Sequence, residues 1–137
     1  MHLNPYLFFN GNCEQAFKLY EQVLGGKITM MMPHEGSPAE AHTPPEWRKK
    51  IMHARLVAGD MVLMGSDSPP PHQEPMKGFS VSLQVDKATD AERIFGALSK
   101  GGTVKMPLEK TFWAERFGML VDQFGTPWMI NCEGDAR

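Results

Sequence analysis

The segment HARL, at residues 53–56, places an imidazole and a guanidinium two positions apart. A neutral imidazole accepts or donates a proton near neutral pH, which makes His53 the candidate catalytic residue. The guanidinium of Arg55 suits an anionic ligand, or an acid of the same chain such as Glu115. In a strand both side chains share one face. The simpler alternative for His53 is a hydrogen bond to a neighbouring strand or loop.

The segment FSVSLQVD, at residues 79–86, indicates how a strand would present such side chains. Its aliphatic residues alternate with polar ones, which is typical of a strand with one buried face. We predict that the aliphatic residues pack beneath a helix. The polar residues Ser80, Ser82 and Gln84 are then expected to face away from that helix.

A repeat accounts for most of the chain. Residues 3–30 and 79–106 share one pattern, and the glycine pairs Gly25-Gly26 and Gly101-Gly102 lie 76 positions apart (101 minus 25). Before each pair, apolar residues recur at helical spacing, and a glycine suits the residue after a helix. Each half is therefore predicted to form a strand, a helix, a strand and a hairpin. The sequence predicts an α+β fold made of two βαβββ repeats.

Two proline-rich stretches interrupt this pattern. We expect a single domain over residues 1–137, with repeat halves at about 1–66 and 77–137 and a proline-rich linker at 67–76. Residues 33–47 predict a long loop inside the first half. Such a loop is often a lid or a binding loop, and the alternative is a surface insertion.

The composition of the chain excludes several classes of protein. Its 137 residues carry a formal charge of −2, which does not favour binding to nucleic acid. No apolar run approaches the roughly 20 residues that span a bilayer, and no export signal is evident, so a cytoplasmic protein is expected. Cys13 and Cys132 have neither a metal-binding spacing nor the pattern of a disulfide framework. The eleven methionines indicate an adaptable core or pocket lining.

Three segments together resemble a known family: PYLFFNGNCEQAFKLYEQVLGG (5–26), KIMHARLVAG (50–59) and DQFGTPWMIN (122–131). They are similar to the PhnB-like branch of the vicinal oxygen chelate superfamily, which includes glyoxalase I, bleomycin-resistance proteins and extradiol dioxygenases. The resemblance implies curved mixed sheets around a concave pocket, with a helix on each convex face. It also implies a homodimer, in some members with halves exchanged between chains. Members of this branch often carry a 3-demethylubiquinone-9 3-methyltransferase label.

The repeat and the resemblance together predict which side chains line the concave pocket. The first strand and the third strand contribute side chains by the same alternation as the segment FSVSLQVD, and the last strands complete the lining. Because a slip of one residue inverts a strand, each assignment depends on register. The predicted ligand-binding residues are Asn4, Tyr6, Phe8, Arg55, Leu63, Ser80, Ser82, Gln84, Trp113, Phe117, Met119, Met129 and Asn131. Trp128, which alternates with Met129, is expected to pack against the second helix instead.

The metal enzymes of the superfamily take ligands from four strand positions. In this sequence those positions fall at Asn4 or Pro5, at Leu63, at Phe79 or Ser80, and at Met129. None offers the imidazole, carboxylate or thiolate that divalent metals prefer, so we expect no metal and no cofactor.

The leading hypothesis from the sequence is a metal-independent protein that binds a small molecule. One alternative is a lyase-like or isomerase-like enzyme with His53 as acid or base. Another is the methyltransferase of the family label, for which the sequence shows no strand followed by a glycine-rich nucleotide loop.

Overall fold

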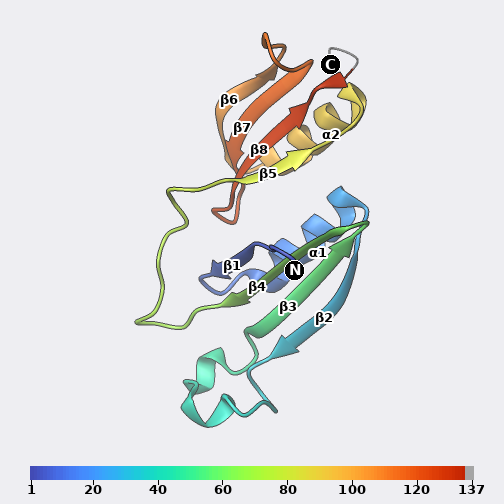
Figure 1. Ribbon diagram of the computed structural model, residues 1–137. Coiled ribbons are helices and arrows are strands. Elements are labelled where there is room, and N and C mark those ends of the chain that lie inside the picture. Colours follow the sequence, from blue (N-terminus) through green and yellow to red (C-terminus); the bar gives the residue numbers. More distant parts are fainter. Residues whose placement is uncertain (135–137) are drawn as a thin grey trace. The chain divides into compact units, whose positions relative to one another are not determined.

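The computed structural model describes residues 1–134 and divides the chain into two compact units, Met1–Glu74 and Pro75–Arg137 (Figure 1). The first unit contains a four-stranded sheet, one α-helix, and two short 3-10 helices in the proline-rich loop. Its elements are β1 (Tyr6–Phe9), α1 (Cys13–Leu24), β2 (Lys27–Pro33), η1 (Glu40–His42), η2 (Pro45–Trp47), β3 (Ile51–Ala58) and β4 (Met61–Asp67).

The second unit repeats the order of strands and helix, and no 3-10 helix lies between its strands β6 and β7. Its elements are β5 (Val81–Gln84), α2 (Ala88–Ser99), β6 (Thr103–Glu109), β7 (Arg116–Val121) and β8 (Pro127–Cys132). The strand order is β1-β4-β3-β2 in the first sheet and β5-β8-β7-β6 in the second. In each sheet the first pair is parallel and the other pairs are antiparallel. The predicted α+β fold with two βαβββ repeats is confirmed.

Each helix covers one face of its own sheet (Figure 1). Leu7 and Phe9 of β1 are almost fully buried beneath α1, together with Phe17 and Tyr20 of the helix. In the second unit α2 buries Ile94 on the face of its sheet that carries Trp128, of which 1% is exposed. Burial of these apolar surfaces stabilises each unit. We call the opposite face of each sheet, which its helix does not cover, the open face of that unit.

Two glycines identify the helix face by close packing. A Cβ atom on Gly65 would lie 2.9 Å from the ring of Phe17, and one on Gly118 would lie 2.6 Å from the ring of Phe95. Each ring belongs to the helix of the same unit, so both glycines point at a helix. Side chains alternate along a strand, which assigns the neighbours of each glycine to the open face.

The register of β4 corrects one predicted residue. Leu63 pairs with Leu56 and is buried, with 6% exposed, on the same face as Gly65. Leu63 therefore packs under α1, and Met64 takes the open-face position. The cause is the turn before the strand: Gly59 and Asp60 alone join Ala58 to Met61, whereas five residues join Val121 to Pro127 in the second unit.

A bulge occurs at the same place in β2 and β6. Ile28 pairs with Leu56 on the helix face, but Met30 pairs with Arg55 on the open face. The extra residue between them shifts the alternation by one position. In β6 the same irregularity separates Val104 from Met106, which pairs with Met119 on the open face of the second unit.

No helix within residues 1–134 has both the length and the apolar character needed to cross a membrane.

Candidate functional site

The open face of the first unit carries a row of four cross-strand partners, which we call the first row. Tyr6 pairs with Met64, Met64 with Arg55, and Arg55 with Met30, so the row crosses all four strands. Directly opposite residues on neighbouring strands have Cβ atoms about 5 Å apart. The first row is therefore a continuous line of side chains in contact distance of one another.

An aromatic cluster lies beside the first row. The hydroxyl of Tyr6 is 3.1 Å from Nδ1 of His53, and the two rings stack with centroids 5.6 Å apart. The ring of Phe8 lies 5.1 Å from that of Tyr6, and Phe8 is 56% exposed. Met32, the cross-strand partner of His53, is 37% exposed. The cluster thus combines apolar surface with a proton donor and an acceptor.

Arg55 has a neutral partner at this site. Its Nη1 donates a hydrogen bond to the hydroxyl of Thr29 over 3.2 Å. Within residues 1–134 no carboxylate forms an ion pair with Arg55. Arg55 lies between Met30 and Met64 in the first row, and the residue as a whole is half-buried. Its positive charge is therefore available to an anion.

The open face of the second unit carries the equivalent second row. Ser82 pairs with Met129, Met129 with Met119, and Met119 with Met106. The second row has the same strand order as the first, with three thioethers and a hydroxyl. It contains no charged group.

Amides and aromatic rings surround the second row. Asn131 donates a hydrogen bond from its side-chain nitrogen to the side-chain oxygen of Gln84 over 2.6 Å. Asn131 is 8% exposed, and its Oδ1 has no hydrogen-bond partner within residues 1–134. Phe117 lies on the same face and contacts the ring of Trp113, with centroids 5.4 Å apart. This surface offers hydrogen bonds and apolar contacts without charge.

The structure places the predicted residues in three groups. Those on an open face are Tyr6, Phe8, His53, Arg55, Ser82, Gln84, Phe117, Met119, Met129 and Asn131. Asn4 and Ser80 precede β1 and β5, and Trp113 lies in the link before β7 with 47% of its surface exposed. Leu63 lies on the helix face. The role of all these residues in binding stays a prediction.

Sequence reasoning missed four methionines on the open faces: Met30, Met32, Met64 and Met106. The bulges in β2 and β6 bring Met30 and Met106 to these faces, and no pattern in the sequence marks those bulges. Met64 was not predicted on the open face, because the turn before β4 is shorter than the equivalent turn of the second unit. The Gly59-Asp60 pair could have indicated a two-residue hairpin, because glycine is favoured at the first position of such turns.

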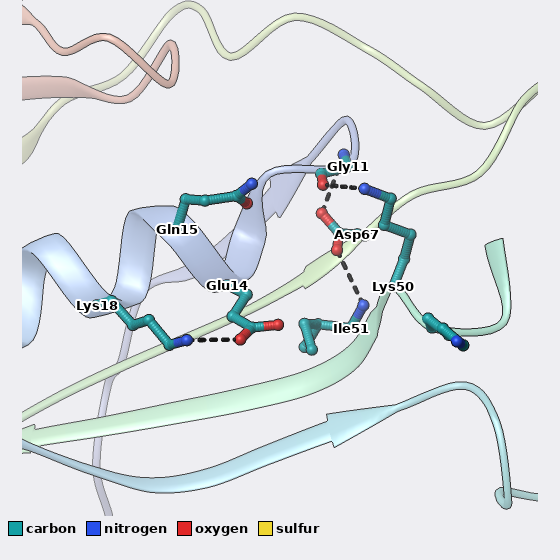
Figure 2. Close-up of a pocket in the computed structure, with 8 residues that line it drawn as sticks. Gly11, Glu14, Gln15, Lys18, Lys50, Ile51 and Asp67 are labelled. Carbon is teal, nitrogen blue, oxygen red and sulfur yellow. Dashed lines mark hydrogen bonds and ion pairs between the residues drawn. The ribbon is translucent and has the colours of Figure 1, made fainter. Parts of the chain in front are cut away.

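A pocket of about 370 Å³ lies elsewhere in the first unit, where the N-terminal end of α1 meets β3 and β4 (Figure 2). Lys18 donates to Glu14 over 2.7 Å, and Lys50 donates to the carbonyl of Gly11 over 3.0 Å. Asp67 also points into this region and accepts backbone hydrogen bonds. Its lining residues are Gly11, Glu14, Gln15, Lys18, Lys49, Lys50, Ile51 and Asp67. The pocket contains none of the predicted site residues, and most of its charged groups already have partners, so we place the candidate site on the open faces.

Cys13 lies beside this pocket as a buried thiol. Burial raises the pKa of Cys13 well above its ordinary value, and the nearby carboxylates of Asp67 and Glu14 raise it further. The thiolate, not the thiol, is the nucleophile of cysteine chemistry. Cys13 is therefore a structural residue.

The comparison with known proteins identifies the family. A family model described as the Glyoxalase/Bleomycin resistance protein/Dioxygenase superfamily matches residues 2–130. The chain belongs to this superfamily. Its sequence is 34% identical over 140 residues to protein YjdN of Escherichia coli (strain K12), which covers 96% of this chain and 95% of YjdN.

Two solved structures are similar to this chain over nearly its whole length. The crystal structure of protein PA1353 from Pseudomonas aeruginosa is 52% identical, with a TM-score of 0.91 over 98% of this chain and 99% of that one. A putative 3-demethylubiquinone-9 3-methyltransferase, PhnB protein, from Bacillus cereus has a TM-score of 0.81 over 96% of this chain and 99% of that one. At 19% identity, the second similarity shows a shared fold alone.

The divalent metal of the superfamily's metal enzymes does not fit the residues present in this chain. With the register of β4 corrected, the fourth-strand positions of the two units hold Met64 and Met129. Thioethers are soft donors and poor ligands for hard or borderline divalent ions. Within residues 1–134, no group of three or more His, Cys, Asp or Glu side chains is placed to share a metal ion.

Proposed function

We propose that this glyoxalase-superfamily protein binds a small organic molecule with an aromatic ring and an anionic group, without a divalent metal ion. The observation that carries the proposal is the position of Arg55 on the first open face. Its guanidinium has a hydroxyl partner and, within residues 1–134, no carboxylate partner, and it lies next to a stacked Tyr6–His53 pair.

The chemistry of this face supports both parts of the ligand. A guanidinium matches a carboxylate or phosphate through two parallel hydrogen bonds. The rings of Tyr6 and Phe8, which are 37% and 56% exposed, provide apolar surface for a flat ring. Methionine side chains beside them adapt to ligands of different shape.

The second open face is proposed to bind uncharged groups. Ser82, Gln84 and Asn131 supply hydrogen bonds, while Phe117 and the methionines of the second row supply apolar contact. The resemblance to the PhnB-like branch supports a homodimer in the cytoplasm as the setting for this binding. Light scattering during gel filtration would test the homodimer, and a monomeric mass at micromolar concentration would contradict it.

The experiment for the binding proposal screens aromatic carboxylates and aromatic phosphates against the metal-free protein, with calorimetry on the hits. Arg55→Gln is expected to weaken binding by about tenfold or more, because hydrogen bonds to a charged group contribute about 1.5–3 kcal/mol. Arg93→Gln removes the same charge from α2, on the other side of the second sheet, and is the matched control. Equal losses in both variants, or hits that bind only in the presence of a divalent metal, would contradict the proposal.

A second candidate function follows from the 3.1 Å contact between Tyr6 and His53. A tyrosine hydroxyl that donates to Nδ1 leaves the proton of neutral His53 on Nε2, and so orients the ring for acid–base chemistry. An enzyme of the lyase or isomerase type is then expected to lose turnover in His53→Ala while ligand binding persists. Tyr6→Phe is expected to shift the pH profile of turnover. Unchanged turnover in His53→Ala would exclude this role.

Methyl transfer finds no support in this chain. β1 is followed by Asn10, Gly11 and Asn12 rather than by a glycine-rich nucleotide loop. Calorimetry with S-adenosylmethionine at millimolar concentration is expected to show no binding. A saturable heat signal would restore this alternative.

A further inference from the structure

The second row brings three thioethers onto adjacent strands. Met106, Met119 and Met129 are direct cross-strand partners on β6, β7 and β8. We propose that this row binds a soft monovalent cation, Cu(I) in the cell and Ag(I) as its experimental analogue. This inference goes beyond the proposed ligand binding, because it concerns a metal ion and the open face of the second unit.

The spacing of the strands suits a shared ion. Neighbouring strands lie about 4.8 Å apart, and opposite Cβ atoms lie about 4.5–5.5 Å apart. Methionine has three rotatable side-chain bonds, so the thioethers of Met106 and Met129 can lean inward from either side of Met119. The three sulfur atoms can then meet one ion above the central strand. Pairing of the strands holds the backbone of the three methionines in place in the ion-free protein.

The donors are also of the right kind and accessible. Thioether and thiolate sulfur select Cu(I) over hard divalent ions. Met106 is 43% exposed, and Met119 and Met129 are partly exposed. An ion therefore reaches this row without unfolding the sheet.

The first row is an internal control for this proposal. It has Met30 and Met64 at the positions of Met106 and Met129, but Arg55 stands between them. A guanidinium offers no lone pair for a metal and repels a cation. The proposal therefore assigns the soft ion to the second row and excludes it from the first.

A thioether has no proton to lose on binding a metal, whereas histidine and cysteine sites weaken as pH falls. Binding at the second row is thus expected to persist at about pH 5, where unperturbed histidines are protonated. This behaviour separates the row from His53 and from the four other histidines of the chain.

The experiment titrates Ag(I) into protein with ¹³C-labelled methionine methyl groups at about pH 5, with calorimetry on the same samples. Of the eleven methionine signals, those of Met106, Met119 and Met129 are expected to shift together at one equivalent of ion. Met119→Leu is expected to weaken binding by about tenfold or more, since even indirect partners of a metal site are worth that much. Leucine is similar in volume, so the sheet is expected to fold.

Three further variants distinguish loss of the ion site from loss of folding. Met106→Leu changes an exposed side chain, so it tests the row even where Met119→Leu fails to fold. Met61→Leu is the matched control, because Met61 is also 43% exposed but lies outside both rows. Equal affinity in wild-type protein and Met106→Leu, or ion-dependent shifts confined to methionines outside the second row, would overturn the proposal. Loss of Ag(I) binding in Arg55→Gln would also overturn the proposal. Because Arg55 belongs to the proposed ligand site, this variant tests the two sites separately.

Discussion

The two open faces share one backbone arrangement but differ in chemistry. Both rows cross four strands in the same order, and a bulge brings the outermost methionine of each row to the open face. The third position of the row holds Arg55 in the first unit and Met119 in the second. We propose that this difference decides whether the row attracts an anion or a soft cation. The repeat preserves the positions of the side chains, while substitutions at those positions change the chemistry of each face.

The two units also use a buried aspartate in different ways. Asp67, which is 3% exposed, accepts hydrogen bonds from the backbone of Gly11, Cys13 and Ile51, and so joins β4 to α1 and β3. Asp122 is also 3% exposed, but it accepts from Phe124, Thr126 and the indole of Trp128. The first aspartate connects distant segments, and the second organises one turn.

The largest expected effect on stability comes from removing one of these two aspartates. Asp67→Ala is expected to lower the free energy of unfolding by at least about 3 kcal/mol, roughly 1 kcal/mol for each donor left without a partner. Asp122→Ala is expected to cost less, because its three donors lie within six residues of Asp122 in the sequence, so that no distant segments lose a connection. Urea unfolding of both variants would measure the difference. An equal or greater cost for Asp122→Ala would contradict this account.

The next effect concerns the glycines beneath the helices. Gly65→Ala and Gly118→Ala are each expected to destabilise the protein by about 1–3 kcal/mol, because the new methyl group would overlap a helix aromatic ring. Gly96→Ala is the control, since nothing lies within 4 Å of a Cβ atom there and Gly96 is helical. That variant is expected to raise stability by up to about 1 kcal/mol. Thermal unfolding of the three variants would test the packing that defines the open faces.

A smaller effect is expected on ligand affinity when the residues at the third position of the two rows are exchanged. Arg55→Met gives the first row a third thioether, and we expect it to gain Ag(I) binding while losing anion affinity by about tenfold, or about 1.4 kcal/mol. Met119→Arg is the reverse exchange and is expected to lose Ag(I) binding. Calorimetry on both variants would measure the two affinities. Retention of anion affinity in Arg55→Met would mean that the row does not determine the ligand.

The last effect is the pH dependence of stability due to Cys13, which is absent at neutral pH. Its pKa is raised in the folded protein, so the unfolded chain releases the thiol proton first as pH rises. Stability is therefore unaffected below the ordinary pKa of about 8.5 and declines above it, by at most about 1.4 kcal/mol per pH unit. Unfolding of wild-type protein and Cys13→Ala at about pH 8 and about pH 10 would isolate this contribution. An identical alkaline decline in the two proteins would contradict it.

Much of the fold could be predicted from the sequence because local patterns of apolar residues determine where helices and strands form. The helical spacing before the glycine pairs and the alternation in FSVSLQVD fixed the element order and the phase of β5. These patterns depend on residues near one another in the chain, and so they can be interpreted without knowing which strands pair. Most predicted open-face residues followed from the same alternation. The predicted packing of Trp128 on the helix face is confirmed as well.

The remaining features depended on pairing between strands, which the sequence by itself does not contain. Leu63 was assigned to the wrong face because the turn before β4 has two residues where the equivalent turn has five, and a difference of an odd number of residues inverts the strand that follows. Met30 and Met106 reach the open faces through bulges that only the partner strands define. Thus the sequence determined the two βαβββ repeats. Only the tertiary structure decided which methionines become cross-strand neighbours on an open face, because such neighbours exist only once distant strands have paired.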